Sequence, residues 1–205
     1  MRRDAQRNRE RILEAARAGF AERGLGITLD EIARLAGVGV GTVYRRFPNK
    51  ELLIDALFEA KLDEVSALAE AMLEQPDAWA GIAGFLENGV SMLANDRGLR
   101  ELMLGSAYGP ERVMRSRARI KPLVERLVAR GQAQGVVRAD LGATDFPLLL
   151  IMLDAVVDAT RAVDPQKWRR ALAIVLDGLA ASRTPLPGAP LDDDQLVATM
   201  AAWTP

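Results

Sequence analysis

Apolar residues recur at helical spacing along almost all of the 205-residue chain. Between positions 28 and 36, Leu29, Ile32, Ala33 and Ala36 fall at i, i+3, i+4 and i+7, which is the apolar stripe of a helix rather than the alternation of a strand. The same period, broken by Gly, Pro and Asn, predicts helices over about residues 4–23, 28–36, 39–47, 49–73, 77–94, 99–107, 111–134, 145–163, 165–182 and 192–202. No stretch has a strand pattern, so the sequence predicts an all-α fold.

Residues 28–47 predict two short helices joined by a tight turn. Thr28 followed by Glu31 is typical of a capping box, and Gly37-Val38-Gly39 supplies a turn where positive φ or close helix approach favours glycine. The second helix leaves polar side chains outside, namely Thr42, Tyr44, Arg45 and Arg46. A short exposed helix of this kind, held by a preceding helix, suits the major groove of DNA. The alternative is a helical hairpin whose charges are merely solvated.

The next predicted helix links two parts of the chain. Asn49 is a good N-cap, and nothing breaks the pattern as far as Leu73, so about 25 residues would form a rod about 37 Å long. The sequence therefore predicts a helix-turn-helix DNA-binding domain at 1–48, the linking helix at 49–73, and a C-terminal effector-binding and dimerisation domain over 49–205.

The helices predicted at 145–163 and 165–182 are apolar on more than one stripe. A helix that buries two faces needs a second packing partner. We expect these helices of two identical chains to form an antiparallel four-helix interface, which makes the protein a homodimer.

Large or adaptable apolar side chains are spread over several predicted helices of the C-terminal part. Such side chains suit a pocket for an irregular small molecule. The candidate ligand-binding residues are Trp79, Phe85, Met92, Met103, Tyr108 and Met152. An ordinary packed core would use the same residue types, so this alternative stays open.

Asp154 and Asp158 lie four residues apart on an otherwise apolar helix. A buried carboxylate needs a partner, which could be Arg161, an arginine across the dimer, or a cationic ligand. The two carboxylates are also the best acid and base pair that an enzyme could use here. However, nothing nearby suggests a nucleophile, a metal or a phosphate cradle.

The chain contains no Cys and no His. This absence excludes disulfides, Cys or His metal sites and catalysis by a Ser-His-Asp triad. We therefore expect no enzyme activity, no cofactor and no metal.

Charge is distributed unevenly along the chain. Residues 1–50 hold 11 Lys and Arg against 6 Asp and Glu, whereas residues 51–205 hold 16 against 22. A basic N-terminal part on an acidic body suits a DNA-binding module, because phosphate attraction is needed on one face only. Chance clustering of arginines in the first helix is the alternative, and those arginines either approach phosphates or form a solvated face.

No segment predicts export or a membrane span. The N-terminus has no apolar run after Arg2 and Arg3, and the most apolar segment, 146–157, is shorter than the roughly 20 residues that a span needs. We expect a soluble, cytoplasmic protein without a signal peptide.

Several motifs together resemble the TetR family of bacterial one-component regulators. The resemblance rests on Ile12-Leu13-Glu14-Ala15-Ala16, Phe20-Ala21-Glu22-Arg23-Gly24, Ala36-Gly37-Val38, Gly41-Thr42-Val43-Tyr44 and Phe47-Pro48-Asn49-Lys50-Glu51-Leu52. It covers roughly residues 8 to 60. Farther along, only length and helical layout are similar.

The resemblance implies roles for eight residues. Thr42, Tyr44 and Lys50 would contact phosphates, and Thr28 would add one contact at its helix N-terminus. Val40 and Arg45 would read bases, because an apolar side chain suits the thymine methyl and a guanidinium suits guanine. Gly41 would let the backbone approach DNA, and Gly39 would leave space. The family often has Ser at the place of Gly39 and a polar residue at that of Val40, so the base preference stays open.

Together these features predict a repressor that a small-molecule ligand releases from a palindromic operator. The alternatives are an effector-independent activator or architectural DNA-binding protein and, less favoured, a helical enzyme that uses Asp154 and Asp158.

Overall fold

The computed structural model describes residues 2–96, 100, 110–182 and 184–202. Within them every element is helical apart from one isolated antiparallel bridge between Val137 and Ala180, which confirms the predicted all-α class. The elements are α1 (Arg2–Arg23), the 3-10 turn η1 (Gly24–Gly26), α2 (Leu29–Ala36), α3 (Val40–Arg46), α4 (Lys50–Leu73), α5 (Ala78–Asn95), α7 (Pro110–Ala133), α8 (Asp145–Thr160), α9 (Trp168–Leu179) and α10 (Asp193–Ala202). The helix predicted at 99–107 lies, apart from Arg100, outside the described residues. None of the described helices combines the length and apolarity needed to cross a bilayer.

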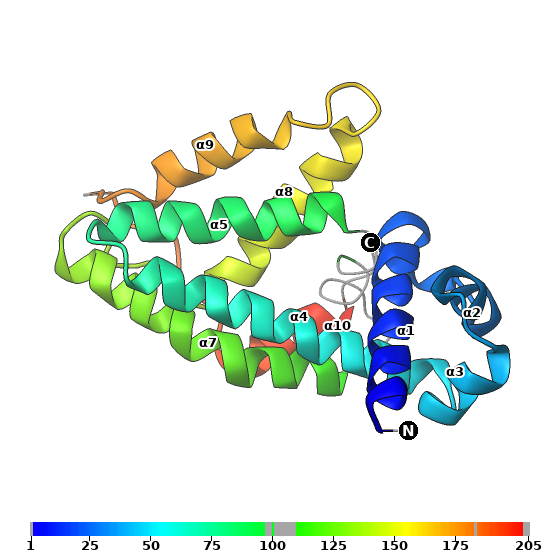
Figure 1. Ribbon diagram of the computed structural model, residues 1–205. Coiled ribbons are helices and arrows are strands. Elements are labelled where there is room, and N and C mark those ends of the chain that lie inside the picture. The colour runs from blue at the N-terminus through cyan, green and yellow to red at the C-terminus, as the bar shows by residue number, and fades with distance from the viewer. Residues whose placement is uncertain (1, 97–99, 101–109, 183, 203–205) are drawn as a thin grey trace.

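The first three helices gather at one end of the molecule, and α4 runs from them into the body (Figure 1). Their core includes Ile12 of α1, Ile32 of α2 and Val43 of α3, each fully buried, together with Leu53 and Leu62 from the first part of α4. We call this set of helices the head. Apolar side chains from α1, α2, α3 and α4 form the core of the head, so α3 cannot shift without disturbing the packing of the other three helices.

The long helix α4 belongs to both parts of the molecule. It begins where the sequence predicts, because the Asn49 side chain accepts a hydrogen bond from the Leu52 amide at 2.9 Å. Leu62 packs in the core of the head, whereas Ala69 packs in a second core. With 24 residues, α4 is about 36 Å long.

The second core lies between α4, α5, α7, α8 and α9, which we call the body. Phe85 of α5 and Phe146 of α8 meet with ring centroids 6.2 Å apart, and Trp168 at the start of α9 is only 2% exposed. The helices α4 and α7 lie side by side (Figure 1). Ion pairs tie them together: Arg115 contacts Asp55 at 3.0 Å and Glu59 at 3.1 Å, and Arg119 contacts Asp63.

The prediction that Asp164 alone separates the last two body helices is wrong. Helix α8 ends at Thr160 and α9 begins at Trp168, so residues 161–167 form the connection. Two side chains account for the longer loop: Asp164 accepts a hydrogen bond from the Gln166 amide at 2.9 Å, and Pro165 has no amide hydrogen with which to continue a helix. Helix α9 ends at Leu179, whereas the sequence predicted an end at Ser182. The helix stops earlier because Ala180 pairs with Val137 in the isolated bridge.

Beyond α9, the chain folds back over the body. Arg138 is 7% exposed and donates hydrogen bonds to the carbonyls of Gly178 and Thr184, both at 3.0 Å. Its hydrogen bonds to Asp140 hold the pKa of that carboxyl well below its usual range. Helix α10 then buries Leu196 and Met200 in a small separate cluster.

Candidate nucleic-acid interface

Helix α3 is anchored by two residues and exposed over the rest of its length. Val43 is fully buried and Phe47, directly after the helix, is 4% exposed, so one side of α3 faces the head core. Val40 and Tyr44 are 40% and 46% exposed. Exposed apolar and aromatic side chains on a rigid helix are typical of a contact surface.

The turn before α3 is fixed by a glycine and an arginine. Gly37 has φ of 61° and its amide donates to the carbonyls of Ala33 and Arg34, which ends α2 in the left-handed conformation that glycine adopts most easily. Arg11 Nη2 of α1 donates to the Gly37 carbonyl at 3.2 Å, and a Cβ at Gly37 would lie 2.8 Å from that nitrogen. Arg11 therefore ties α1 to the turn before α3, a contact that spacing along α1 could not reveal.

The start of α2 carries the predicted capping box. The Thr28 hydroxyl accepts from the Glu31 amide at 3.3 Å, and the Thr28 amide donates to the Glu31 carboxylate at 2.8 Å. The hydrogen bond from the Thr28 amide lowers the pKa of Glu31, and Arg23 supports the same carboxylate at 3.3 Å. Thr28 is exposed at this helix terminus, but its polar groups are already engaged with Glu31.

Arg45 and Thr42 lie on the same side of α3. Arg45 Nη2 donates to the Thr42 hydroxyl at 3.1 Å, and the Arg45 side chain is exposed. Because the guanidinium has five N–H donors, most of them stay available for another acceptor. The contact with Thr42 orders the arginine.

Lys50 differs from the other predicted contact residues because its ammonium is already bound within the head. Lys50 Nζ donates to the carbonyl of Leu25 in η1, and the side chain is half-buried. An ammonium has three donors, so it can hold Leu25 and still direct an N–H outward.

Packing within the chain does not explain why residues 39 and 41, at the start of α3, are glycines. A Cβ added at Gly41 would meet nothing within 4 Å, and one at Gly39 would only approach the Thr42 hydroxyl at 3.9 Å. Both residues are exposed. The structure thus places Val40, Gly41, Thr42, Tyr44 and Arg45 on α3 and Gly39 at its N-cap, with Thr28 and Lys50 at neighbouring helix starts.

Comparisons with known proteins match both parts of the chain. Residues 12–57 match the model of bacterial regulatory proteins of the tetR family, and residues 75–181, more than half of the chain, match the C-terminal domain of SbtR-like transcriptional regulators. A crystal structure of a TetR transcription regulatory protein from Mycobacterium vanbaalenii is 33% identical, with a TM-score of 0.63, and the match covers 87% of this chain and 98% of that one. The chain belongs to the TetR family.

Two further comparisons set the limits of the likeness. The HTH-type transcriptional regulator YhgD of Bacillus subtilis is 44% identical over 64 residues, which are 31% of this chain and only 34% of that protein. The matched stretch thus spans about a third of the length of this curated relative. The match to the structure of RolR in complex with resorcinol covers 100% of this chain and 98% of the RolR chain, with a TM-score of 0.58. The sequences are only 21% identical, so this match shows the fold alone.

Membership of the TetR family makes the protein a DNA-binding transcriptional regulator, not an enzyme. Regulators of this family bind DNA and dimerise, and some bind small-molecule ligands. In this TetR-family chain the first match contains α2 and α3, which form the helix-turn-helix, and the second match contains α5, α7, α8 and α9.

The predicted ligand residues are dispersed over the body of this TetR-family chain. Phe85 is buried beside Phe146, Trp79 packs against the same core, Met92 packs in the cluster under α10, and Met152 is 48% exposed. None of these four lines either of the two cavities described below. Met103 and Tyr108 lie outside the described residues.

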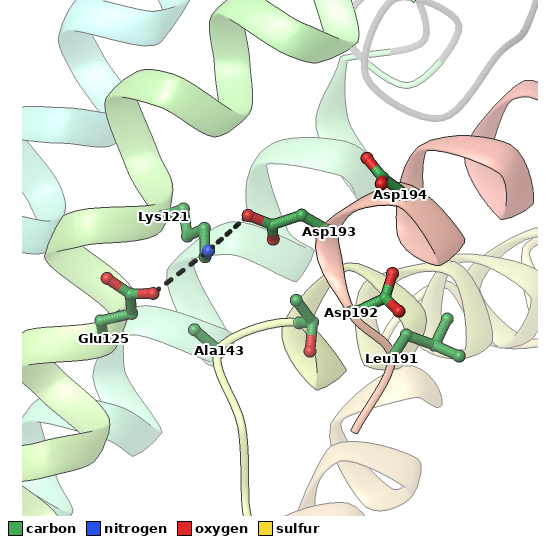
Figure 2. A pocket seen from close by; sticks show the side chains of 8 residues that line it. Lys121, Glu125, Ala143, Leu191, Asp192, Asp193 and Asp194 are labelled. Atoms are coloured by element: carbon green, nitrogen blue, oxygen red, sulfur yellow. Dashed lines mark hydrogen bonds and ion pairs between the residues drawn. The ribbon is translucent and has the colours of Figure 1, made fainter. Parts of the chain in front are cut away.

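The larger of these cavities, about 500 Å³, opens between α7, the start of α8 and α10. Figure 2 shows Lys121 between Glu125 and Asp193, which it contacts at 3.3 Å and 2.8 Å. The hydrogen bond to Asp193 raises the pKa of Lys121. This hollow is the seam where α10 attaches to α7.

Of the partners considered for the carboxylates of α8, Arg161 pairs with neither, and Arg100, which the sequence did not suggest, contacts Asp158. Arg100 Nη1 contacts Asp158 at 2.8 Å, whereas its Nε stays 4.0 Å from Asp154 Oδ1, too far for a hydrogen bond. Asp154 is 7% exposed, and burial raises the pKa of its carboxyl. Arg161 instead donates to the Ala94 carbonyl at 3.3 Å. Within the described residues, no group of three acidic side chains could hold a metal ion.

Proposed function

We propose that this TetR-family regulator is a homodimeric repressor that binds a pseudo-palindromic operator and is released by a small-molecule effector. The observation that carries the proposal is the outer face of α3, where Val40, Tyr44 and Arg45 are exposed on a helix whose opposite side is fully packed. A helix so presented enters a major groove without rearrangement of the head.

The exposed residues of α3 divide the work of DNA recognition. Arg45 and Val40 read base edges, because a guanidinium pairs with guanine O6 and N7 and an isopropyl group packs on a thymine methyl. Thr42 and Tyr44 bind phosphates through their hydroxyls, and Thr28 and Lys50 add contacts from the starts of α2 and α4. Gly39 and Gly41 keep the helix start narrow, so that the backbone lies close to the duplex.

The second copy of the chain covers α8 and α9. Met152, Ala155 and Ala159 form an exposed apolar stripe on α8, and Ile174 of α9 is 66% exposed. Unpaired apolar faces on two neighbouring helices suit a self-complementary two-fold interface. Met152 then serves the dimer rather than an effector site.

Such a dimer places two heads at a defined distance. Helix α9 lies on the side of the body away from α3, so the interface leaves both DNA-binding surfaces free (Figure 1). The proposed division is a DNA-binding domain at 1–48 and an effector-binding and dimerisation domain at 49–205, with α4 joining them. An effector that binds more tightly to the dimer when the distance between its two heads does not fit the operator lowers DNA affinity. The loss equals the difference between its binding free energies for the two arrangements.

The body is the place for the effector. RolR, which shares the fold, has been crystallised with resorcinol, a single-ring compound. We propose that this chain likewise takes a small organic molecule between its body helices.

Selection of bound sequences from a random DNA pool tests the DNA-binding part. The expected product is an inverted repeat whose half-site centres lie about 34–36 Å apart or at a multiple of that spacing. Light scattering of the eluting protein should give twice the mass of one chain. Enrichment of a single unrepeated half-site, or a monomer in solution, would contradict the proposed dimer. Operator binding that no compound releases in a thermal-shift and release screen would favour the effector-independent alternative.

A further inference from the structure

A second, smaller cavity lies at the corner of the body where α8 turns toward α9. It has a volume of about 200 Å³ and lies between the end of α5, the end of α8 and the start of α9. It shares no lining residue with the seam beneath α10. It is also separate from the helix-turn-helix.

The wall of this cavity carries positive charge without negative charge. Arg161, the C-cap of α8, and Arg169 of α9 both line it, and no Asp or Glu is among its described lining residues. Arg161 uses one donor for the Ala94 carbonyl and makes no ion pair within the described part of the chain. Most of its N–H groups are therefore free for an acceptor.

Arg169 is held in place from several directions. It pairs with Glu87 of α5, its Nε donates to Gln166 Oε1 at 2.9 Å, and its guanidinium lies 4.6 Å from the centre of the Trp168 ring. A guanidinium fixed in this way is ordered before a ligand arrives, which lowers the entropy that binding costs. The two exposed carboxylates nearby have partners, since Glu87 contacts Arg169 and Asp158 contacts Arg100, whereas the buried Asp154 has an oxygen without a hydrogen bond and interacts with Arg161 only through its charge.

The remaining wall is partly apolar and small. Val157 and Trp168 line the cavity and are 3% and 2% exposed. Ser91 and Asn95 of α5 add a hydroxyl and an amide. Since an engineered apolar cavity of about 150 Å³ takes up benzene, a cavity of about 200 Å³ has room for one six-membered ring with a small substituent.

We propose that this cavity is a binding site for a small monocarboxylate of about the size of benzoate. The carboxylate pairs with Arg161 and receives a second donor from Arg169, and the ring packs on Val157 and Trp168. Planar pairing between a guanidinium and a carboxylate is favourable in both geometry and charge.

The proposed dimer leaves this site accessible. Val157 and Arg161 point to the opposite side of α8 from Ala155 and Ala159, because residues two positions apart on a helix differ by about 200° in direction. Arg161 is itself exposed, which gives the cavity a route to solvent. Binding here therefore requires neither DNA nor opening of the dimer.

Calorimetric titration of the full chain with sodium benzoate tests the site. We expect saturable binding of one benzoate per chain and a raised melting temperature. Benzyl alcohol, which has the ring without the charge, should bind at least tenfold more weakly. A wild-type protein that neither releases heat nor gains melting temperature at millimolar benzoate would overturn the proposal.

Variants locate the binding within the molecule. Arg161→Gln removes the charge, yet its amide can still donate to the Ala94 carbonyl, and we expect benzoate affinity to fall at least tenfold. Arg170→Gln is the matched control, because Arg170 is an exposed arginine of the same corner that does not line the cavity, and affinity should be unchanged. Equal affinity of wild type and Arg161→Gln would place benzoate elsewhere and refute the site.

A second variant covers the case in which Arg161→Gln lowers the melting temperature of the unliganded protein. Ser91→Val narrows the same cavity from α5 without changing any charge. Loss of benzoate binding in a variant that melts like wild type supports the site, and retained affinity refutes it.

Discussion

Gly41 is a helical residue where the chain itself has room for a side chain. A Cβ there would meet no atom within 4 Å. Glycine is a poor helix residue, so its presence in an uncrowded helix has a cost without a packing benefit. Its benefit therefore lies in what approaches the helix from outside, which the proposed close contact with DNA provides.

Replacing Gly41 by alanine should separate stability from DNA binding. We expect the unfolding free energy of Gly41→Ala to stay equal or rise by up to about 1 kcal/mol, because alanine favours the helix. Operator affinity should fall about tenfold, which corresponds to about 1.4 kcal/mol. Urea melts and fluorescence anisotropy measure the two quantities. Gly89→Ala, in α5, is the control, since a Cβ there would make an ordinary 3.5 Å contact with Leu150 and DNA affinity should not change.

Arg45 and Arg46 allow base reading to be separated from general charge. Both are exposed arginines of the same helix, but Arg45 is the one ordered by Thr42. Arg45→Ala should cost about 1–3 kcal/mol of operator affinity and blur one operator position. Arg46→Ala should weaken operator and scrambled duplex to a similar, smaller extent. A loss for Arg45→Ala that is the same on both duplexes would argue against base reading.

Asp154 gives a stability prediction with a defined sign. Its pKa is raised in the folded protein, chiefly by burial and only partly offset by Arg100. The folded state then holds the proton more tightly than the unfolded state, so the ionised carboxylate costs stability at neutral pH, and this cost disappears as pH falls toward the ordinary Asp range.

Asp154→Asn should therefore be as stable as wild type at pH 7 or more stable by up to about 1 kcal/mol, because no buried charge remains. The difference should shrink as the pH is lowered toward the ordinary range of an Asp carboxyl, because wild type takes up its proton on the way. Urea melts at pH 7 and at a series of lower pH values test this. Asp158→Asn, which loses the exposed pair with Arg100, should behave oppositely at pH 7 and be slightly less stable. An advantage of Asp154→Asn that grows at low pH would contradict the assignment.

At the scale of elements, local sequence was sufficient to predict where helices start, but it was insufficient to predict which distant residues pair with each other. Asn49 caps α4 as predicted and Asp77 caps α5 in the same way, because a cap acts on an amide two or three residues away. Arg100 could not be assigned to Asp158, which lies 58 positions further along the chain. Lys50 and Leu25 are likewise joined only by the fold.

The candidate DNA-binding surface was predictable for the same reason. Five of its positions lie in α3 and Gly39 directly precedes that helix, so the spacing of Val43 and Phe47 was enough to show which side of α3 faces outward. An effector site assembled from several helices has no such local signal, and the residues predicted for it are scattered over the body. Volume between packed helices is set by many contacts together and cannot be read from residue type.

The ion pairs between α4 and α7 should add little to the free energy of unfolding, and what they add should depend strongly on salt concentration. Arg115 and Arg119 are 45% and 41% exposed at their side chains. The double variant Arg115→Gln/Arg119→Gln should lose at most about 1–2 kcal/mol at low salt, and the loss should vanish near 1 M NaCl. Melts across a salt series test this. Arg126→Gln, an exposed arginine of the same helix, is the control, and a loss that persists in high salt would show a packing role instead.

At the scale of the whole molecule, the regulator has two hydrophobic cores that share helix α4. In our proposal, two such chains form a two-fold symmetric dimer. The head is held by Ile12, Ile32 and Val43, the body by Phe85, Phe146 and Trp168, and α4 contributes to both. Because a single head reads few base pairs, the dimer is required for tight and selective operator binding.

Disrupting the proposed interface should thus weaken DNA binding without touching the head. Ile174→Asp places a charge on the exposed face of α9 and should convert the dimer to a monomer in light scattering. Operator affinity should fall at least a hundredfold, because half of the contacts are lost. Val163→Asp is the matched control, since Val163 is 90% exposed in the connection after α8 and lies off the stripe. An Ile174→Asp protein that stays dimeric would move the interface elsewhere.

The meeting of two cores on α4 has a consequence for how such proteins can be rebuilt. The last buried head-core residue on this helix is Leu62, and Val65 is the first residue that packs against the body core, so the change from one core to the other falls at residues 63–64. Neither family match includes these residues, because one ends at residue 57 and the other begins at residue 75. A chimaera spliced within these residues, in helical register, would inherit the operator of one parent and the chemical sensitivity of the other.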